Sequence, residues 1–292
     1  MSLTTEQVPP ILERRILAPA SALVDESVRI QVVGLEPFQI VTVRAAMQTR
    51  GRYWWESHAA FQTDAQGTID LSSQKPQSGT YDETDPMGLF WSMSFKPAKE
   101  MEAIAAIVPP LLKGTVRLIV EVDGQVIAWT DIVRSILSPG VSATRVRDKG
   151  LAGILFRPAG QGPFPTVVVL GGSSGGLGRE ARYGALLASH GFAVLALAYF
   201  HYADLPKELV EIPLEYFEKA IAWLQSHAEV NPYALGVVGF SRGGELALIL
   251  GATFPALRRG SPMPRVIELT RVLGTECGKW SRRVIATSGL TH

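Results

Sequence analysis

Gly239-Phe240-Ser241-Arg242-Gly243 is the stretch of this sequence that decides the fold. The apolar run Leu235-Gly236-Val237-Val238 precedes it, and the helix-forming run Glu245-Leu246-Ala247-Leu248-Ile249-Leu250 follows it. A Gly-x-Ser-x-Gly at a strand-to-helix junction is typical of a nucleophile elbow, whose glycines allow close backbone packing. Ser241 would be exposed at the helix N-terminus, with the amide of Arg242 directed at a developing oxyanion. We therefore predict a serine hydrolase with Ser241 as nucleophile; a chance match in a glycine-rich chain is the alternative.

A second glycine-rich stretch, Gly171-Gly172-Ser173-Ser174-Gly175-Gly176-Leu177-Gly178, follows the apolar run Thr166-Val167-Val168-Val169-Leu170. It also contains Gly-x-Ser-x-Gly, centred on Ser174, but we expect the next helix to begin near Arg179, too late for an elbow. A flexible loop after an early strand is typical of the segment that completes an oxyanion hole. We predict that Ser173 or a neighbour donates the second backbone N–H there, with a permissive surface turn as the alternative.

The same stretch raises the question of a nucleotide site. Gly176-Leu177-Gly178-Arg179-Glu180-Ala181 matches the pattern Gly-x-Gly-x-x-Ala of dinucleotide-binding loops. However, the turn after Leu170 is too long for a tight phosphate grip, and the next strand, Ala193 to Ala198, ends in Tyr199-Phe200-His201. No acidic residue stands there to bind a ribose hydroxyl. We therefore predict neither a cofactor nor a metal.

The composition is that of an ordinary globular protein, with 292 residues, 47% hydrophobic and 19% charged, enough for two domains. A net charge of +1 gives no overall attraction to nucleic acid or anionic membranes. The start, Met1 to Gln7, lacks the layout of a secretion signal, and no apolar run approaches the ~18 residues of a membrane span. The single cysteine, Cys277, fits a reducing compartment. We predict a cytoplasmic protein without nucleic-acid or membrane partners; the sequence indicates no oligomeric state.

Residues 8–138 are predicted to form an all-β, immunoglobulin-like sandwich domain. Short alternating runs, such as Val28 to Val33 and Ile40 to Arg44, are separated by Gly, Pro and Asp turns, as in antiparallel sheets. The clearest hairpin joins residues 116–122 to residues 125–130 through Asp123-Gly124, a turn that needs positive φ. Ser138-Pro139-Gly140 then marks a domain boundary.

Residues 141–256 are predicted to form a second domain in which apolar strands alternate with helices. The expected elements before the elbow are strands 153–156, 166–170 and 192–198 and helices 181–189 and 213–227. This alternation implies a mainly parallel sheet covered on both faces. Pro213 stands in the favoured first turn of its helix, and the apolar residues that follow at three- and four-residue steps form one core face.

Seven strings of residues, spread over both expected domains, are more specific than the elbow alone. Those of the first domain are Gly34-Leu35-Glu36-Pro37 and Asp85-Pro86-Met87-Gly88-Leu89-Phe90-Trp91-Ser92-Met93. Those of the second are Gly162-Pro163-Phe164-Pro165, Gly191-Phe192-Ala193-Val194-Leu195-Ala196-Leu197-Ala198-Tyr199-Phe200, Asp204-Leu205-Pro206-Lys207, Leu214-Glu215-Tyr216-Phe217-Glu218 and the elbow extended to Leu246. Over roughly residues 8 to 256 the chain resembles the acyl-CoA thioesterase and bile acid-CoA:amino acid N-acyltransferase family.

This resemblance implies a β-sandwich fused to an α/β-hydrolase domain that acts on acyl-CoA through a Ser (or Cys), Asp, His triad. Acyltransferase members carry Cys as nucleophile, so Ser241 resembles the hydrolytic branch, in which water discharges the acyl-enzyme. The implied oxyanion donors are the backbone amides near Arg242 and Ser173. We expect an acyl-CoA thioesterase; the alternatives are a carboxylester or dienelactone-type hydrolase, an acyl-CoA:amino acid N-acyltransferase and a non-catalytic remnant.

The catalytic base is difficult to find in this sequence. The α/β-hydrolase fold has the chain order Ser, then Asp or Glu, then His, so both partners should follow Ser241. The terminal His292 is the only histidine after it, and Glu268 and Glu276 are the only carboxylates beyond the elbow helix. We therefore expect the Asp and His of the triad to be missing and the activity to be impaired.

The other histidines precede Ser241, which is the wrong order for this fold. His201 stands at the C-terminal end of a strand and could line the cleft. His227 is interpreted as a solvated residue at a helix end, while His58 and His190 belong to no pattern. None of these four is predicted to be the base.

Residues 257–292 form an atypical tail. They carry seven basic and two acidic residues, a balance of +5 that leaves −4 for the rest of the chain. Because the resemblance stops near residue 256, we interpret the change as a truncation, recombination or frame shift after Pro255, with a divergent surface tail as the alternative. A sheet that ended after the elbow helix would leave an unpaired edge and bare apolar helix faces, so we expect poor solubility.

Overall fold

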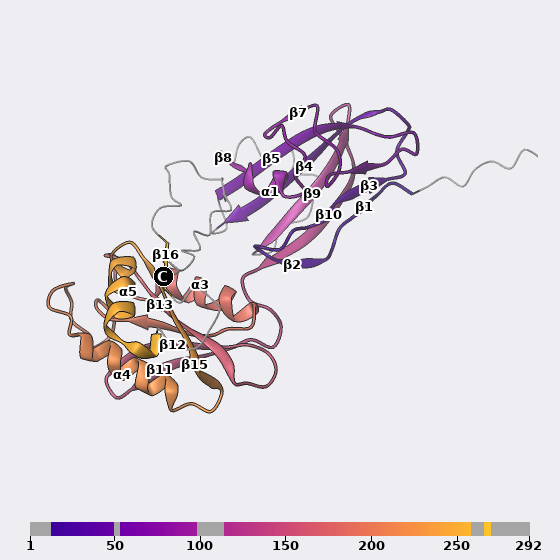
Figure 1. The fold of residues 1–292 in the computed structure, drawn as a ribbon. Helices are drawn as coiled ribbons and strands as arrows, with labels where there is room; N and C mark the ends of the chain where they lie inside the picture. The colour runs from indigo at the N-terminus through magenta and orange to yellow at the C-terminus, as the bar shows by residue number, and fades with distance from the viewer. Residues whose placement is uncertain (1–12, 50–52, 98–113, 258–265, 270–292) are drawn as a thin grey trace, which may run out of the picture. The chain divides into compact units, whose positions relative to one another are not determined.

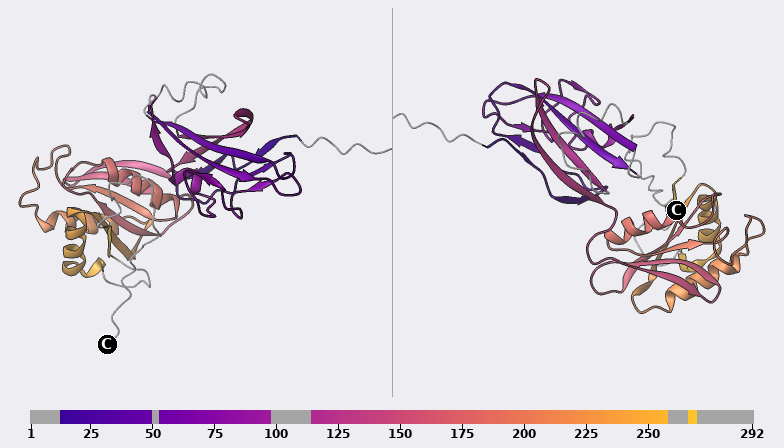
Figure 2. Two further views of the ribbon diagram at one scale, coloured as in Figure 1. Left: turned by 90° about the horizontal axis from the view of Figure 1, so that it is seen from above. Right: turned by 180° about the vertical axis from the view of Figure 1, so that it is seen from behind.

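The computed structural model describes residues 13–49, 53–97, 114–257 and 266–269, which fall into two compact units. The division lies between Ser135 and Ile136, just before the predicted boundary at Ser138-Pro139-Gly140. Figures 1 and 2 show the first unit, which begins in indigo, as strands with the short helix α1, and the second, which runs to yellow, as a sheet flanked by helices. An all-β sandwich domain therefore precedes an α/β-hydrolase domain.

The first unit consists of two sheets. Its elements are β1 (Arg15–Leu17), β2 (Ser21–Leu23), β3 (Gln31–Val33), β4 (Ile40–Thr49), β5 (Tyr53–Gln62), β6 (Ile69–Asp70), β7 (Ser78–Gly79), α1 (Gly88–Trp91), β8 (Ser94–Lys96), β9 (Thr115–Val122) and β10 (Gln125–Ser135). The smaller sheet has the order β1-β3-β6, and the larger has β2-β10-β9-β4-β5-β7, with β8 also paired to β5. Among the described strands of this unit, all pairs are antiparallel except β2 with β10, so the predicted antiparallel sandwich contains a parallel pair.

Alternating apolar residues hold these sheets together. Val41 and Val43 of β4 and Leu118 of β9 are at most 1% exposed and belong to one core with residues of the smaller sheet. The predicted hairpin at Asp123-Gly124 is confirmed, because both residues have positive φ, 49° and 76°, and join β9 to β10. The alternation of apolar and polar residues therefore explains how the two sheets pack, and the turn residues explain how β9 is joined to β10.

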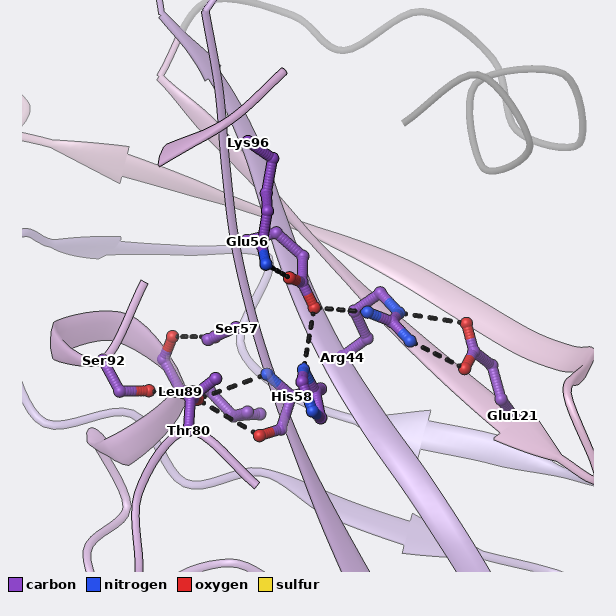
Figure 3. A network of polar contacts seen from close by, with 9 residues as sticks. All are labelled: Arg44, Glu56, Ser57, His58, Thr80, Leu89, Ser92, Lys96 and Glu121. Carbon is purple, nitrogen blue, oxygen red and sulfur yellow. Dashed lines mark hydrogen bonds and ion pairs between the residues drawn. The ribbon is translucent and has the colours of Figure 1, made fainter. Parts of the chain in front are cut away.

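A network of charged side chains joins β4, β5, β8 and β9 of the larger sheet, and Figure 3 shows its residues. Arg44 of β4 donates hydrogen bonds to the Glu56 carboxylate and, through Nε and Nη2, to both oxygens of Glu121, each at 3.1 Å. The Glu56 carboxylate also lies 3.1 Å from His58 Nδ1 and 3.7 Å from Lys96 Nζ. Burial alone would lower the pKa of Arg44, but Glu121 and Glu56 together raise it. The Glu56 side chain is thus nearly buried, 4% exposed, and contacts three basic side chains.

Glu56→Ala is expected to lower the free energy of unfolding by about 3 kcal/mol, because it leaves partly buried cations without their shared anion. Arg29→Met is the matched control: Arg29 is 68% exposed in its pair with Asp70, and losing such a pair costs at most about 1 kcal/mol. Urea unfolding of the two variants measures the difference. Equal losses would contradict the structural role given to Glu56.

The second unit is a six-stranded sheet with helices. Its elements are β11 (Ser142–Asp148), β12 (Leu151–Arg157), β13 (Phe164–Leu170), α3 (Gly178–Ser189), β14 (Ala193–Ala198), α4 (Leu214–Gln225), β15 (Val230–Phe240), α5 (Arg242–Thr253), a 3-10 turn (Pro255–Leu257) and β16 (Val266–Leu269). The strand order is β11-β12-β14-β13-β15-β16. The last four strands in this order run parallel, while β11 and β12 are antiparallel to their neighbours. The predicted mainly parallel sheet is confirmed.

Helices cover both faces of this sheet, as predicted. Val169 packs in a cluster with residues of α3, whereas its neighbours Val168 and Leu170 pack with residues of α4 and α5. Successive strand side chains point to opposite faces, so each helix layer receives alternate residues. One detail differs from the prediction: Pro213 is the N-cap, with extended ψ of 135°, and the helix begins at Leu214.

The expected unpaired edge at β15 is wrong. β16, from the segment interpreted as an atypical tail, pairs with β15 in parallel from Val237↔Val266 to Phe240↔Leu269. The reason is local: Val266-Ile267-Glu268-Leu269 is a short run rich in residues that favour strands. The rest of the tail's charge pattern lies outside the described residues. On α5, Leu248 and Ile249 are about half exposed, as expected for a bare apolar helix face.

Candidate active site

The strand-to-helix turn at Ser241 has the backbone of a nucleophile elbow. β15 ends at Phe240, α5 begins at Arg242, and Ser241 between them has φ 53° and ψ −121°. This left-handed region is uncommon for a residue with a side chain and costs roughly 1–3 kcal/mol, so it persists only where the surroundings enforce it. Ser174, the centre of the second Gly-x-Ser-x-Gly, has no positive φ. Only the Ser241 motif therefore has elbow geometry.

The two glycines of the elbow are required by contact with neighbouring backbone. A Cβ atom at Gly239 would overlap the carbonyl of Gly243. A Cβ at Gly243 would overlap the carbonyl of Gly171, which follows β13. The prediction that only glycine fits at Gly239 and Gly243 is confirmed. The elbow is also packed directly onto the loop after β13.

Parallel pairing brings the ends of three strands to one edge of the sheet. Leu170 of β13 stands opposite Leu197 of β14 and opposite Gly239 of β15. The segments that follow these strands therefore emerge side by side, at the carboxyl edge where open α/β sheets bind ligands. Ser241 is exposed at this edge.

The first predicted oxyanion donor is the backbone amide of Arg242, and Arg242 is the first residue of α5. The first amides of a helix have no partner within the helix, and here the Ser241 carbonyl accepts from Gly244 N at 2.8 Å and Glu245 N at 3.3 Å. The Arg242 side chain is exposed and donates to Glu245 at 2.7 Å. The role of the Arg242 amide stays a prediction.

The second predicted donor, Ser173, lies in the loop that contacts Ser241. Ser173 is exposed within a turn closed by Gly175 N to Gly172 O at 3.2 Å. A Cβ at Gly172 would stand 3.1 Å from Ser241 Cβ and 3.7 Å from Ser241 Oγ, so Gly172 packs against the Ser241 side chain. The Ser173 amide belongs to the peptide that begins at Gly172. Its role as a donor also stays a prediction.

Two residues that were not predicted from the sequence, Tyr199 and Glu180, contact Gly171 at the start of this loop. Tyr199, directly after β14, donates a buried hydrogen bond of 2.6 Å from its hydroxyl to the Gly171 carbonyl. Burial and the charge of Glu180 raise the pKa of Tyr199 to about 12, so its hydroxyl stays protonated. Glu180 of α3 lies against Gly171 and is 2% exposed. Tyr199 directly after an apolar strand was the available sequence signal, whereas Glu180 stands between Arg179 and Ala181 and gave none.

Within the described residues, no hydrogen bond joins a histidine side chain to Ser241. His201 is exposed, with φ 50°, and its position after β14 next to Gly175 agrees with a place near the loop. His227 was interpreted as solvated, but it is half-buried: Nδ1 lies 2.8 Å from the Trp223 carbonyl, and the two rings are 4.0 Å apart. The prediction that His227 is solvated is therefore wrong, because its ring packs against the indole of Trp223.

The residues after Ser241 supply little of a triad in the described part of the chain. Glu245 is exposed and paired with Arg242, and Glu268 is described only by its backbone in β16. Glu276 and His292 lie outside the described residues. No group of three or more His, Cys, Asp or Glu side chains in the described ranges could hold a metal ion. None of the helices described is long and apolar enough to cross a membrane.

Comparison with known proteins gives two matching family models. The acyl-CoA thioester hydrolase/BAAT N-terminal region matches residues 25–148, and the BAAT/acyl-CoA thioester hydrolase C-terminal region matches residues 212–259. Acyl-coenzyme A amino acid N-acyltransferase 1 of Mus musculus is 39% identical over 80% of this chain and 58% of its own length. Acyl-coenzyme A thioesterase 2, mitochondrial, of Homo sapiens is 39% identical over 81% of this chain and 49% of its own length.

This chain spans between 49% and 58% of the length of these relatives. Among solved structures, 2,6-dihydroxy-pseudo-oxynicotine hydrolase is 24% identical with a TM-score of 0.35, covering 41% of this chain and 35% of that one. Esterase Est22 is 23% identical with a TM-score of 0.34, covering 41% and 39%. The overlap is limited, so strand order and elbow geometry carry the fold assignment.

Proposed function

Because this chain belongs to the acyl-CoA thioester hydrolase/BAAT family, we propose that it is an acyl-CoA thioesterase-type hydrolase whose nucleophile is Ser241. The observation that supports this most strongly is the left-handed backbone of Ser241 at the carboxyl edge of the sheet. Such a turn presents the hydroxyl oxygen to a substrate and places backbone amides behind it.

The proposed reaction is acyl transfer in two steps. Ser241 Oγ attacks the thioester carbonyl carbon and gives up its proton to a base; the C–S bond breaks, and CoA leaves as the thiolate. The amides of Arg242 and Ser173 hold the negatively charged carbonyl oxygen in each tetrahedral intermediate. Water then attacks the acyl-serine ester, releasing a fatty acid and restoring the hydroxyl. Positioned general bases contribute about 10²–10⁴-fold to such steps, so turnover by this chain should be slow without one.

Amino acid N-acyltransferase is a second candidate. The mouse relative named for that activity is as similar as the thioesterases. Both reactions share the acyl-enzyme and differ in whether water or an amine discharges it. The resemblance of Ser241, rather than a cysteine, to the hydrolytic branch supports water as the acceptor.

One experiment compares the candidates on the purified 292-residue protein. Palmitoyl-CoA is supplied with and without glycine, p-nitrophenyl acetate is supplied separately, and free thiol, N-palmitoylglycine, phenolate and the intact protein mass are followed. We expect slow thiol release, a palmitoyl adduct on the protein and free palmitate with or without glycine. Phenolate release without any palmitoyl adduct would indicate a carboxylester hydrolase, and N-palmitoylglycine in place of palmitate would indicate the acyltransferase.

We also propose a cytoplasmic location, supported by the single cysteine, Cys277, which fits a reducing compartment. One similar human protein is named mitochondrial, so the two locations need to be distinguished. Fractionation of cells that make the tagged chain tests this, and recovery with mitochondria would overturn it.

A further inference from the structure

Glu180 is a buried acid that the proposed reaction does not use. It lies in the first turn of α3, is 2% exposed, and its Oε2 atom has no hydrogen-bond partner among the described residues. A carboxylate loses its hydration on burial, which disfavours the charged form. Burial raises the pKa of Glu180, although backbone hydrogen bonds at Glu180 and Arg179 and the Arg179 charge act to lower it. The uncharged carboxyl group therefore persists to higher pH than in an exposed glutamate.

This carboxyl group is one of three contacts that hold Gly171. A Cβ at Gly171 would overlap Glu180 Oε1, so the carboxyl group occupies the place of the missing side chain. The Tyr199 hydroxyl donates to the Gly171 carbonyl at 2.6 Å. The Gly171 carbonyl oxygen also packs against Gly243 at the start of α5, so closely that a Cβ at Gly243 would overlap it. Gly171 is thus fixed by α3, by the end of β14 and by the elbow.

The next residue along the chain, Gly172, packs against Ser241 and carries the peptide that ends in the Ser173 amide. The orientation of Gly171 therefore determines where that amide lies. We propose that Glu180 and Tyr199 are positioning residues that hold the Gly171-Gly172 segment, and with it the predicted oxyanion donor, against the proposed nucleophile. The catalytic meaning of this inference rests on the proposed function, whereas the positioning itself does not.

The surroundings of Glu180 contain little that could neutralise a charge. The titratable groups on the elements around it are Arg179, Arg182 and Tyr183 on α3, Arg157 on β12, which is paired with Glu229, Tyr199 and His201 after β14, and Arg242 and Glu245 on α5. Arg242 and Glu245 are exposed and paired with each other, and the loop 171–177 has no titratable side chain. Because the folded-state pKa is raised, the stability that Glu180 contributes is present at low pH and is lost as pH rises through that raised value.

Three variants test the inference: Glu180→Gln, Glu180→Ala and Tyr199→Phe. The first readout is hydrogen-exchange protection of amides 172–176, corrected for intrinsic rates, with the amides of β13 as an internal measure of folding. The second is the rate at which a fluorophosphonate probe labels Ser241, between about pH 5 and pH 9, where buried carboxyl groups can titrate. Gln retains an uncharged polar group of the same shape, Ala removes the contact with Gly171, and Phe removes only the donor to its carbonyl.

We expect Glu180→Ala and Tyr199→Phe to lose protection at 172–176 but not in β13, and to label between about tenfold and a hundredfold more slowly. Glu180→Gln should match the wild type at low pH and exceed it in protection and labelling as pH rises. A Gln-to-wild-type ratio that stays constant across the pH range, or unchanged loop protection in the Ala and Phe variants, would overturn the inference. If no protein labels but the protection pattern holds, the proposed function has failed and the positioning role stands.

Discussion

Ser241→Ala is expected to abolish the palmitoyl adduct and the fluorophosphonate adduct completely, because no other oxygen nucleophile stands at the elbow. The side chain of Ser241 is exposed at the carboxyl edge of the sheet, on a backbone whose φ of 53° is enforced by Gly239 and Gly243. Removing its hydroxyl leaves this backbone unchanged, so the loss reports chemistry and not folding. Intact-mass spectrometry after incubation with palmitoyl-CoA or the probe measures it.

The matched control is Ser174→Ala. Ser174 is the centre of the other Gly-x-Ser-x-Gly, is also exposed, and lacks a positive φ. We expect this variant to form both adducts at the wild-type rate. If an adduct still forms in Ser241→Ala, or no longer forms in Ser174→Ala, the nucleophile is in the other loop and not at Ser241. Adduct mass is a better readout than turnover here, because an intact oxyanion hole alone retains about 10³–10⁴-fold acceleration over water.

The elbow could be predicted from the sequence because its signal is local. Two glycines, a serine, an apolar strand before it and a helix-forming run after it are all contained between Leu235 and Leu250. The same holds for the hairpin at Asp123-Gly124, where positive φ is a property of the turn itself. Each of these features depends on neighbours in the chain, so residue type and spacing were sufficient.

The features that were missed depend on contacts between distant segments. Glu180 looks like an ordinary exposed acid in the first turn of a helix, and only the fold brings it against Gly171. His227 looks solvated until the turn at the end of α4 places it on Trp223. The strand Val266–Leu269 was not predicted, because the basic residues around it led us to interpret the segment as an atypical tail. Its pairing with β15 depends on the tertiary structure and not on the local sequence. The composition of a segment therefore does not predict which distant segment it pairs with or whether its side chains are buried.

Gly239→Ala and Gly243→Ala are expected to lower the free energy of unfolding by roughly 3 kcal/mol each, a large part of the 5–15 kcal/mol typical of a domain. The added methyl group at Gly239 would overlap the Gly243 carbonyl, and that at Gly243 would overlap the Gly171 carbonyl. Both obstacles are backbone atoms, which cannot rotate away as a side chain can. The turn must open, so Ser241 moves relative to the loop, and a displacement of about 1 Å costs around 10²-fold in rate.

Gly178→Ala provides the control for these two substitutions. Gly178 is the first residue of α3, has no positive φ, and would meet no atom within 4 Å with a Cβ. We expect it to be neutral or to gain up to about 1 kcal/mol, since alanine restricts the unfolded chain more than glycine does. Urea unfolding followed by far-UV circular dichroism, together with the rate of fluorophosphonate labelling, distinguishes the outcomes. If all three variants behave alike, close backbone packing is not what requires glycine at the elbow.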